Sequence, residues 1–172
     1  DDQSWNTNLL DSRPYYHRGD YLRVRSVTSA TAVTTDAPLN DTYTAGADIM
    51  AVKVTPSRVR IYGGGKIICP GTALLDVGVQ LWNAYRSSIE GIEIVNARYC
   101  HINMWRSYES SIVDCKCWTA NPSGNEGAGV LMISNYDCWV RGGSFKAGKH
   151  AVSLTGGSIE ASQPMRLCGA IG

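Results

Sequence analysis

The chain has 172 residues, of which 44% are hydrophobic, and its formal net charge at pH 7 is +1. This length and composition suit one continuous domain that buries a sizeable core. The balanced charge gives no electrostatic argument for nucleic acid or an anionic membrane as a partner, and no apolar run reaches the ~18 residues of a membrane span.

The chain begins with a polar segment, rich in Thr, Ser and Asp, that extends from residue 1 to about residue 43. One strand is predicted in it, from Tyr21 to Val27. A stack of strands needs a cover at its end, because its last strand otherwise exposes an unpaired edge. We therefore expect residues 1–43 to be an irregular entry and capping segment, and residues 44–172 to be the domain that it covers.

Alternating hydrophobic residues begin after this segment. Ile49 to Val54 and Val59 to Ile68 are predicted to form short strands, the second range being divided by a glycine corner. The glycines Gly63 to Gly65 and the following Lys66 lack the spacing and the Ser or Thr of a phosphate-binding loop, and a strand follows them instead of a helix. These residues are predicted to form a corner.

The next part of the chain repeats itself three times without a gap and without a helix signal. The copies are Val79–Ile89, Ile102–Ile112 and Val130–Val140, and a fourth begins at Val152. Their equivalent tyrosines recur at intervals of 23 and 28 residues, and they are Tyr85, Tyr108 and Tyr136. A self-similar unit of this length is typical of solenoids, in which each repeat buries its apolar face only against its neighbours.

Each repeat is predicted to form strand, corner, strand, corner, because its hydrophobic residues alternate at every second position. Stacking the repeats in register places like residues above one another at the strand spacing of ~4.8 Å. We therefore predict an all-β protein, a parallel β-helix with turns of ~23 residues. Its expected inward ladders are Val79/Ile102/Val130, Leu81/Met104/Met132, Ile89/Ile112/Val140 and Ile94/Cys117/Phe145.

A leucine-rich repeat is the main alternative. Ile89, Ile92 and Ile94 imitate its consensus, and 23 residues is an allowed repeat length. Two observations favour the β-helix. The ladder asparagine of leucine-rich repeats is missing from the second and third copies, and the other half of each unit alternates as a strand instead of forming a helix.

One long interruption, Asn121 to Gly127, explains the interval of 28 residues. It is predicted to be a loop that projects outward from a corner. A new unit begins shortly before the chain ends at Gly172, so we expect the solenoid to continue further.

The six cysteines are expected to be free thiols, as in a protein that assembles in a reducing cytoplasm. Cys115 and Cys117 lie two apart on one strand, where the alignment of the repeats directs both into the core. Cys138 falls at a corner and is expected to be partly exposed. The spacing of the cysteines does not match that of a metal site, and we expect neither a metal nor a cofactor.

The segments Val59–Ile67, Gly78–Trp82 and Ser88–Ala97 resemble the opening turns of the pectin-lyase-like right-handed β-helix. Among members of this family, the chain most resembles bacteriophage tailspike proteins, which are capsule- and lipopolysaccharide-degrading depolymerases. The likeness covers roughly residues 20 to 160, and its motifs are specific for the fold but not for chemistry.

The resemblance implies a right-handed helix and a homotrimer in the phage virion. Such a protein is assembled in the host cytoplasm and acts at the bacterial cell surface. The flank of its helix would bind bacterial surface polysaccharide and cleave it, with neither nucleic acid nor membrane insertion involved.

Outward positions of the repeats supply the candidate residues for substrate binding. Trp82 and Trp105 align at one position, and aromatic rows of this kind can stack on sugar faces or pack at a subunit interface or at the edge of the core. The polar candidates are Arg86, Arg106 and Glu126, the last of them on the inserted loop.

Arg86, Glu109 and Asp137 form one outward column, directly after the equivalent tyrosines. Two carboxylates on adjacent turns would lie roughly a strand spacing apart, near the ~5–5.5 Å of retaining glycosidases. Mutual repulsion would keep one of them protonated, as an acid catalyst needs. Glu109 and Asp137, with Asp114 in reserve, are therefore the predicted catalytic residues, and the alternative is a solvated row of corner charges.

Two classes of function remain open. The first is a polysaccharide-degrading enzyme, a hydrolase or a lyase, and in a lyase Arg106 would neutralise developing charge. The second is a non-catalytic receptor-binding or structural fibre module that only holds glycan. The sequence leaves open the glycan, the host and whether the catalytic residues lie after Gly172.

Overall fold

The computed structural model describes residues 22–36, 38, 55–72, 76–118, 127–146, 148–155 and 167–172. All regular secondary structure in these residues is β-strand, which confirms the predicted all-β class. The chain divides into two compact units. One comprises Asp1–Val52 and Gly157–Pro164, and the other comprises Lys53–Gly156 and Met165–Gly172.

The described part of the first unit is an antiparallel hairpin of β1 (Val24–Ser29) and β2 (Ala32–Thr35). Its strands are rich in Val and Thr, whose branched side chains favour extended backbone. The strand that we expected from Tyr21 begins at Val24, and Tyr21 itself lies outside the described residues. The hairpin strands are mostly exposed.

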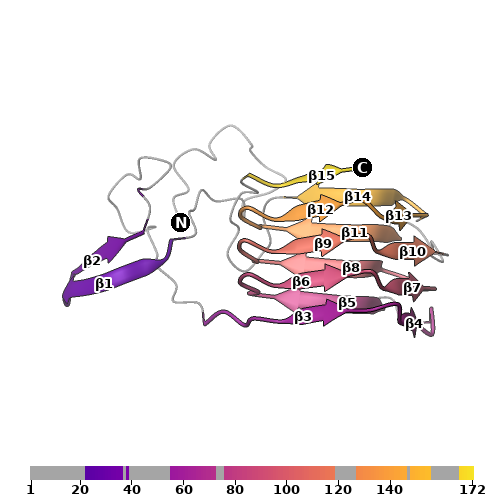
Figure 1. Cartoon of the computed structure of the whole chain (residues 1–172), viewed down its shortest axis with the longest axis horizontal. Helices are drawn as coiled ribbons and strands as arrows, with labels where there is room; N and C mark the ends of the chain where they lie inside the picture. The colour runs from indigo at the N-terminus through magenta and orange to yellow at the C-terminus, as the bar shows by residue number, and fades with distance from the viewer. Residues whose placement is uncertain are drawn as a thin grey trace, which may run out of the picture. The chain divides into compact units, whose positions relative to one another are not determined.

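The second unit consists of three stacks of parallel strands (Figure 1). The first sheet contains β5 (Val77–Trp82), β8 (Cys100–Trp105), β11 (Ala128–Ile133) and β14 (His150–Thr155). The second contains β3 (Arg60–Tyr62), β6 (Ser88–Glu90), β9 (Ser111–Val113), β12 (Trp139–Arg141) and β15 (Gly169–Ile171). The third contains β4 (Lys66–Ile68), β7 (Glu93–Val95), β10 (Lys116–Trp118) and β13 (Ser144–Phe145).

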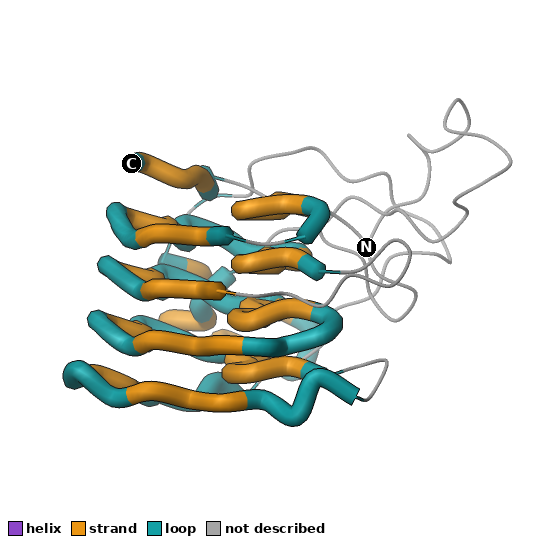
Figure 2. Tube along the Cα trace, turned by 90° about the vertical axis from the view of Figure 1, so that its right-hand side faces the viewer, coloured by secondary structure: helices purple, strands orange, loops and turns teal. Residues whose placement is uncertain are grey.

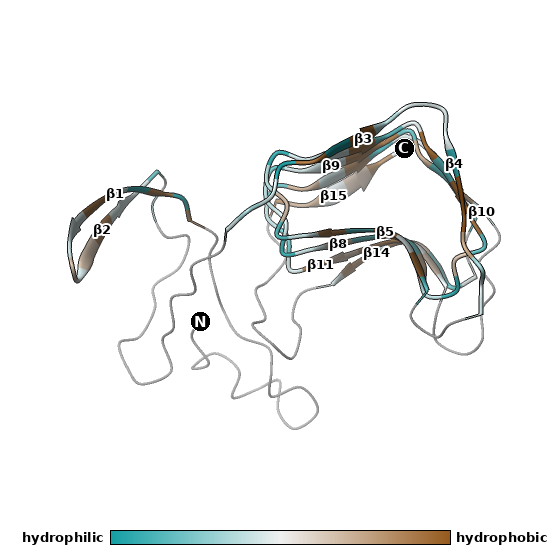
Figure 3. Cartoon of the chain, turned by 90° about the horizontal axis from the view of Figure 1, so that it is seen from below, coloured by the Kyte–Doolittle hydropathy of each residue, from teal (hydrophilic) through white to brown (hydrophobic). Residues whose placement is uncertain are grey.

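Strands that pair are never consecutive in these sheets. From β5 the chain passes through β6 and β7 before β8 pairs with β5, so that each turn visits all three sheets once. Figure 2 shows these turns stacked as layers, and Figure 3 shows the sheets as the sides of one coil. The unit is a right-handed parallel β-helix, as predicted. The described turns contain no helix of the kind that a leucine-rich repeat requires.

The four predicted inward ladders are confirmed by the strand register. Ile89, Ile94, Ile102 and Ile112 are fully buried, and Phe145 is partly buried against the same cluster. Burying one such aliphatic side chain stabilises a protein by roughly 1.5–3 kcal/mol. The stacked ladders are therefore the main source of stability of the coil.

The predicted corner at Gly63 to Gly65 joins β3 and β4, and Gly63 has a positive φ of 112°. After each of the strands β5, β8 and β11 of the first sheet, two positions in the corner have left-handed backbone. The first of these positions holds Asn83, Arg106 and Ser134, and the second holds Arg86, Glu109 and Asp137, all with φ between 47° and 53°. Non-glycine residues pay roughly 1–2 kcal/mol for this conformation, so its recurrence shows that the corner requires it.

Cys115 and Cys117 are fully buried, as predicted, and all six cysteines are free thiols. The prediction that Cys138 is partly exposed was wrong, because it is also fully buried. Its Sγ donates to the carbonyl of Tyr136, as the hydroxyl of Ser110 donates to the carbonyl of Tyr108 one turn earlier. The left-handed residue before each of them turns these side chains inward.

Several predictions fall on residues that the structure does not describe. They are the strand at Ile49 to Val54, the inserted loop apart from Gly127, and the residues that follow Thr155 in the fourth unit. Most of the expected entry segment also lies outside the described residues.

Candidate functional site

Trp82 and Trp105 end the adjacent strands β5 and β8 and face outward, because Leu81 and Met104 before them face the core. Their rings stack with centroids 4.5 Å apart and an interplanar angle of 24°. Trp82 is 41% exposed. The predicted alignment of the two tryptophans is thus confirmed, and it creates an aromatic surface at a corner of the coil.

The equivalent tyrosines form a second aromatic column. Tyr85 pairs with Tyr108 and Tyr108 with Tyr136 through parallel bridges. The ring centroids are 5.7 Å apart in the first pair and 4.9 Å apart in the second. Burial, followed by the negative charge of Glu109, raises the pKa of Tyr108. This hydroxyl therefore stays protonated at neutral pH.

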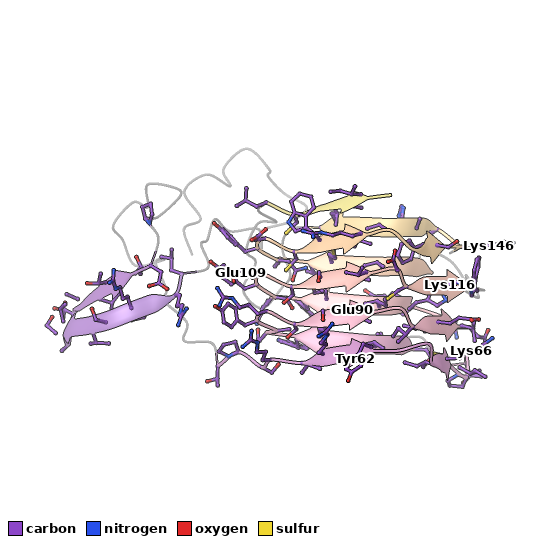
Figure 4. All side chains as sticks on the ribbon, in the orientation of Figure 1. Tyr62, Lys66, Glu90, Glu109, Lys116 and Lys146 are labelled. Atoms are coloured by element: carbon purple, nitrogen blue, oxygen red, sulfur yellow. The ribbon has the colours of Figure 1, made fainter. Side chains whose placement is uncertain are left out.

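Arg86, Glu109 and Asp137 lie in one column, as the sequence predicted. The amide of Arg86 donates to the carbonyl of Tyr108, and the amide of Glu109 donates to that of Tyr136, each at 3.0 Å. Figure 4 shows Glu109 at the end of the turns opposite to Lys66. The structure thus brings both predicted catalytic carboxylates to one corner of adjacent turns.

Both carboxylates already have partners. The Nε of Arg86 donates to Oε2 of Glu109, and this contact raises the pKa of Arg86. The indole Nε1 of Trp139 donates to Oδ1 of Asp137 at 2.9 Å. The Glu109 side chain is 29% exposed. Solvent and a ligand can therefore reach the Glu109 side chain.

Asp114 does not belong to this column. It follows β9, whereas Glu109 precedes it, and its amide donates to the carbonyl of Arg141 at the next corner. A strand of three residues spans roughly 10 Å. The reserve candidate is therefore separated from Glu109 by the length of a strand and cannot act on the same bond.

Arg106 lies directly after Trp105, with its Cζ 5.8 Å from the centroid of the indole ring. Its Nε and Nη2 are shielded from solvent and have no hydrogen-bond partner. Three further buried polar atoms without a partner lie on the same two turns, and they are Nε1 of Trp105, Oδ1 of Asn83 and Oδ1 of Asn103. We call Trp82, Asn83, Asn103, Trp105 and Arg106 the tryptophan corner.

Sequence reasoning missed Asn83 and Asn103. Asn83 occupies the repeat position of Arg106, so the alignment of the copies could have identified it. Asn103 gave no such signal, because its position on a strand predicts an outward and exposed side chain, whereas only 4% of it is exposed. The final candidate, Glu126, lies outside the described residues.

His101 is a further buried polar residue, which the sequence gave no reason to place in a metal or catalytic site. Its Nε2 lies 2.8 Å from the carbonyl oxygen of Trp118, and its Nδ1 lies 3.2 Å from that of Ala128. These carbonyls stand on the two sides of the predicted insertion. His101 therefore contacts the described backbone on both sides of residues 119–126.

Within the part of the chain that the structure describes, no three His, Cys, Asp or Glu residues gather as metal ligands would. That part also contains no helix with the length and apolar character of a membrane span.

Comparison with protein-family models, with curated proteins and with solved structures finds no match to this chain. The fold and the side chains that it displays are therefore the basis for arguing a function.

Proposed function

We propose that this protein binds a bacterial surface polysaccharide, capsule or O-antigen, on the flank of its β-helix and cleaves glycosidic bonds in it. The proposal includes a homotrimer in a phage virion that acts at the bacterial surface, as the resemblance to tailspikes implies. One observation supports the glycan ligand above all. The stacked Trp82 and Trp105 lie beside polar atoms that lack partners within the protein.

A sugar complements this combination of groups. The C–H face of a pyranose packs on an aromatic ring, and its hydroxyls both donate and accept hydrogen bonds. The tryptophan corner presents the partly exposed indole of Trp82. Beside it lie polar atoms that are shielded from solvent and have no partner within the protein.

Cleavage is assigned to Glu109 and Asp137. They occupy equivalent positions on adjacent turns, where the strand spacing of ~4.8 Å approaches the carboxylate separation in retaining glycosidases. In such a mechanism one carboxylate attacks the anomeric carbon and the other protonates the leaving oxygen. Glu109 and Asp137 would share these two roles.

A non-catalytic glycan-binding module is the second candidate. The observation that favours it is the engagement of both carboxylates, Glu109 by Arg86 and Asp137 by Trp139. In this alternative the column stabilises the corner, and the tryptophan corner only holds the glycan.

Incubation of the full chain with a panel of purified capsules and O-antigens distinguishes these functions. Unsaturated oligosaccharides that absorb in the near ultraviolet indicate a lyase, and saturated products with new reducing ends indicate a hydrolase. Binding without products indicates the non-catalytic module. Failure to bind any member would overturn the proposal.

Variants test whether the tryptophan corner carries the binding. Trp82→Ala and Trp105→Ala should weaken it by about tenfold or more, the loss expected when an aromatic stacking partner is removed. Tyr62→Ala is the matched control, because Tyr62 is 72% exposed on β3 of a different sheet. Equal binding by all three variants would move the glycan site elsewhere.

A further inference from the structure

Cys138 and Cys168 occupy equivalent positions on adjacent turns of the coil. Each residue directly precedes a strand, β12 or β15, and these strands pair in register from Trp139 and Gly169 onward. The amide of Gly169 donates to the carbonyl of Cys138 at 3.3 Å. The pairing of the two turns therefore extends to the two cysteines.

The side chains of the two cysteines meet across these turns. The amide of Cys138 donates to Sγ of Cys168 at 3.4 Å. A side-chain hydrogen bond with Cys168, followed by burial, raises the pKa of Cys138. Cys138 is fully buried, and Cys168 packs against the same hydrophobic cluster. The two sulfur atoms are therefore neighbours at the edge of the core.

Serine fills the same column in the two turns before. The amide of Ser87 donates to Oγ of Ser110 at 3.1 Å, as the amide of Cys138 donates to Sγ of Cys168. Sulfur is a weak acceptor, so an oxygen makes this hydrogen bond better. The hydrogen bond alone does not explain why two cysteines follow two serines. Two adjacent thiols can also form a covalent bond, which two hydroxyls cannot.

The backbone of the coil suits a disulfide at this place. Neighbouring strands lie ~4.8 Å apart, and the Cα atoms of cysteines joined by a disulfide lie about 4.4–6.8 Å apart. Cys117 differs from this pair, because it stacks between Ile94 and Phe145 and so has no cysteine above or below it in its column.

Exposure decides which of the two thiols reacts first. Cys168 is partly exposed and Cys138 is not, so a dissolved oxidant meets Cys168. Attack of its sulfur on hydrogen peroxide breaks the O–O bond, forms a sulfenic acid and releases water. The sulfur of Cys138 then attacks the sulfenic sulfur, and the hydroxyl leaves with the thiol proton as water. Two thiols thus lose two hydrogen atoms, and one peroxide becomes two molecules of water.

We infer that Cys138 and Cys168 are an oxidation site, at which hydrogen peroxide joins the turns of β12 and β15 by a disulfide. The pair stays as two thiols in a reducing compartment and closes in an oxidising one. Among the described strands, β15 pairs only with β12. The bond therefore fastens the end strand of its sheet. The inference is independent of glycan binding and cleavage.

Mass spectrometry of the full chain tests this inference. Reduced protein is treated with hydrogen peroxide, freed of it, unfolded, alkylated with iodoacetamide and digested with chymotrypsin without reduction. Cleavage after Trp118 and Tyr136 separates Cys138 from Cys117. We expect a linked pair of peptides that contain Cys138 and Cys168, lighter by two hydrogen atoms than the separate thiol peptides together. Cys117 should be alkylated, and dithiothreitol should open the link.

Three results would overturn the inference. The first is alkylation of both Cys138 and Cys168 after the treatment. The second is oxidation of Cys168 to sulfinic or sulfonic acid while Cys138 is still alkylated. The third is a disulfide between two chains through Cys168, which a non-reducing denaturing gel shows as a dimer.

Variants assign the link to this pair. Cys138→Ser and Cys168→Ser should each abolish it, and Cys138→Ser should fold, because Ser110 occupies the same position one turn earlier. In Cys138→Ser the oxidised Cys168 should remain a sulfenic acid that dimedone labels, whereas the unaltered protein should be labelled little. Cys69→Ser, which removes another buried thiol, is the matched control and should form the link. A link that persists in Cys138→Ser would contradict the assignment.

Hydrogen exchange measures whether the link fastens β15. The amides of Gly169–Ile171 should exchange about tenfold or more slowly in the linked protein, because the bond opposes local opening of this strand. Cys168→Ser after the same peroxide treatment should show no slowing, which separates the effect of the link from that of oxidised methionine. Equal exchange in the linked and the reduced protein would show that the bond does not fasten the strand.

Discussion

Glu109 stands one turn above Arg86 in the same corner column, and the two side chains form an ion pair across adjacent turns. Their backbones share the left-handed conformation, with φ of 47° and 48°. Because both side chains are partly exposed, solvent screens this pair and it contributes little to the stability of the fold. The column can therefore be altered to test chemistry without loss of the coil.

Glu109→Gln and Asp137→Asn test the proposed catalytic pair. Each amide preserves the shape of the side chain but can neither attack nor transfer a proton as the carboxyl group does. Turnover of a cleavable glycan should fall by about 10²–10⁴-fold, with binding nearly unchanged. Initial rates of product formation measure this effect. Asp114→Asn is the control and should keep full activity, and full activity in the first two variants as well would place the catalytic residues elsewhere.

Asn135 should contribute strongly to stability. It is fully buried, its Oδ1 accepts from the amide of Ser107 at 2.7 Å, and its Nδ2 donates to the carbonyl of Met104 at 2.9 Å. Asn135→Ala leaves both groups unsatisfied and should lower the free energy of unfolding by about 2–4 kcal/mol in urea denaturation. Asn135→Ser should be milder, because a serine occupies this position one turn earlier. If the free energy of unfolding of the alanine variant equals that of the unaltered protein within experimental error, the hydrogen bonds of Asn135 do not have this stabilising role.

The buried thiols should resist alkylation in the native protein. Cys115 and Cys117 are fully inaccessible, whereas Cys168 is partly exposed. Treatment with iodoacetamide followed by mass spectrometry should therefore modify Cys168 first and the other two only after unfolding. Rapid native modification of Cys115 and Cys117 would show that the inner ladders open readily.

Cys100 should make stability fall at alkaline pH. Burial, followed by the neighbouring Cys69, raises the pKa of Cys100 from 9.0 to about 12. Below pH 9 the thiol is protonated in both states and stability is unaffected. Between pH 9 and about 12 only the unfolded chain loses this proton, so the free energy of unfolding should fall by up to ~1.4 kcal/mol per pH unit. Denaturation of Cys100→Ala should show a shallower decline over this range, and an equal decline would exclude Cys100 as its cause.

The repeats alone predicted most of the coil. Alternation at every second residue assigns each side chain to the inside or the outside, and the interval between equivalent tyrosines sets which residues stack. Ile89 over Ile112 and Trp82 over Trp105 follow from these two periods, and the structure confirms both. Such local patterns are sufficient because each turn of a solenoid packs chiefly on its neighbours.

The corners were decided by the tertiary structure. There the left-handed backbone breaks the alternation, so Cys138 turns inward although its position in a corner predicted exposure. At the corners a side chain finds its partner on another turn, as Glu109 does in Arg86. Asp114 lies at the opposite end of β9 from Glu109, at a different corner. The unpaired Nε and Nη2 of Arg106 also follow from their burial, which depends on everything packed around a side chain and not on its own place in the repeat.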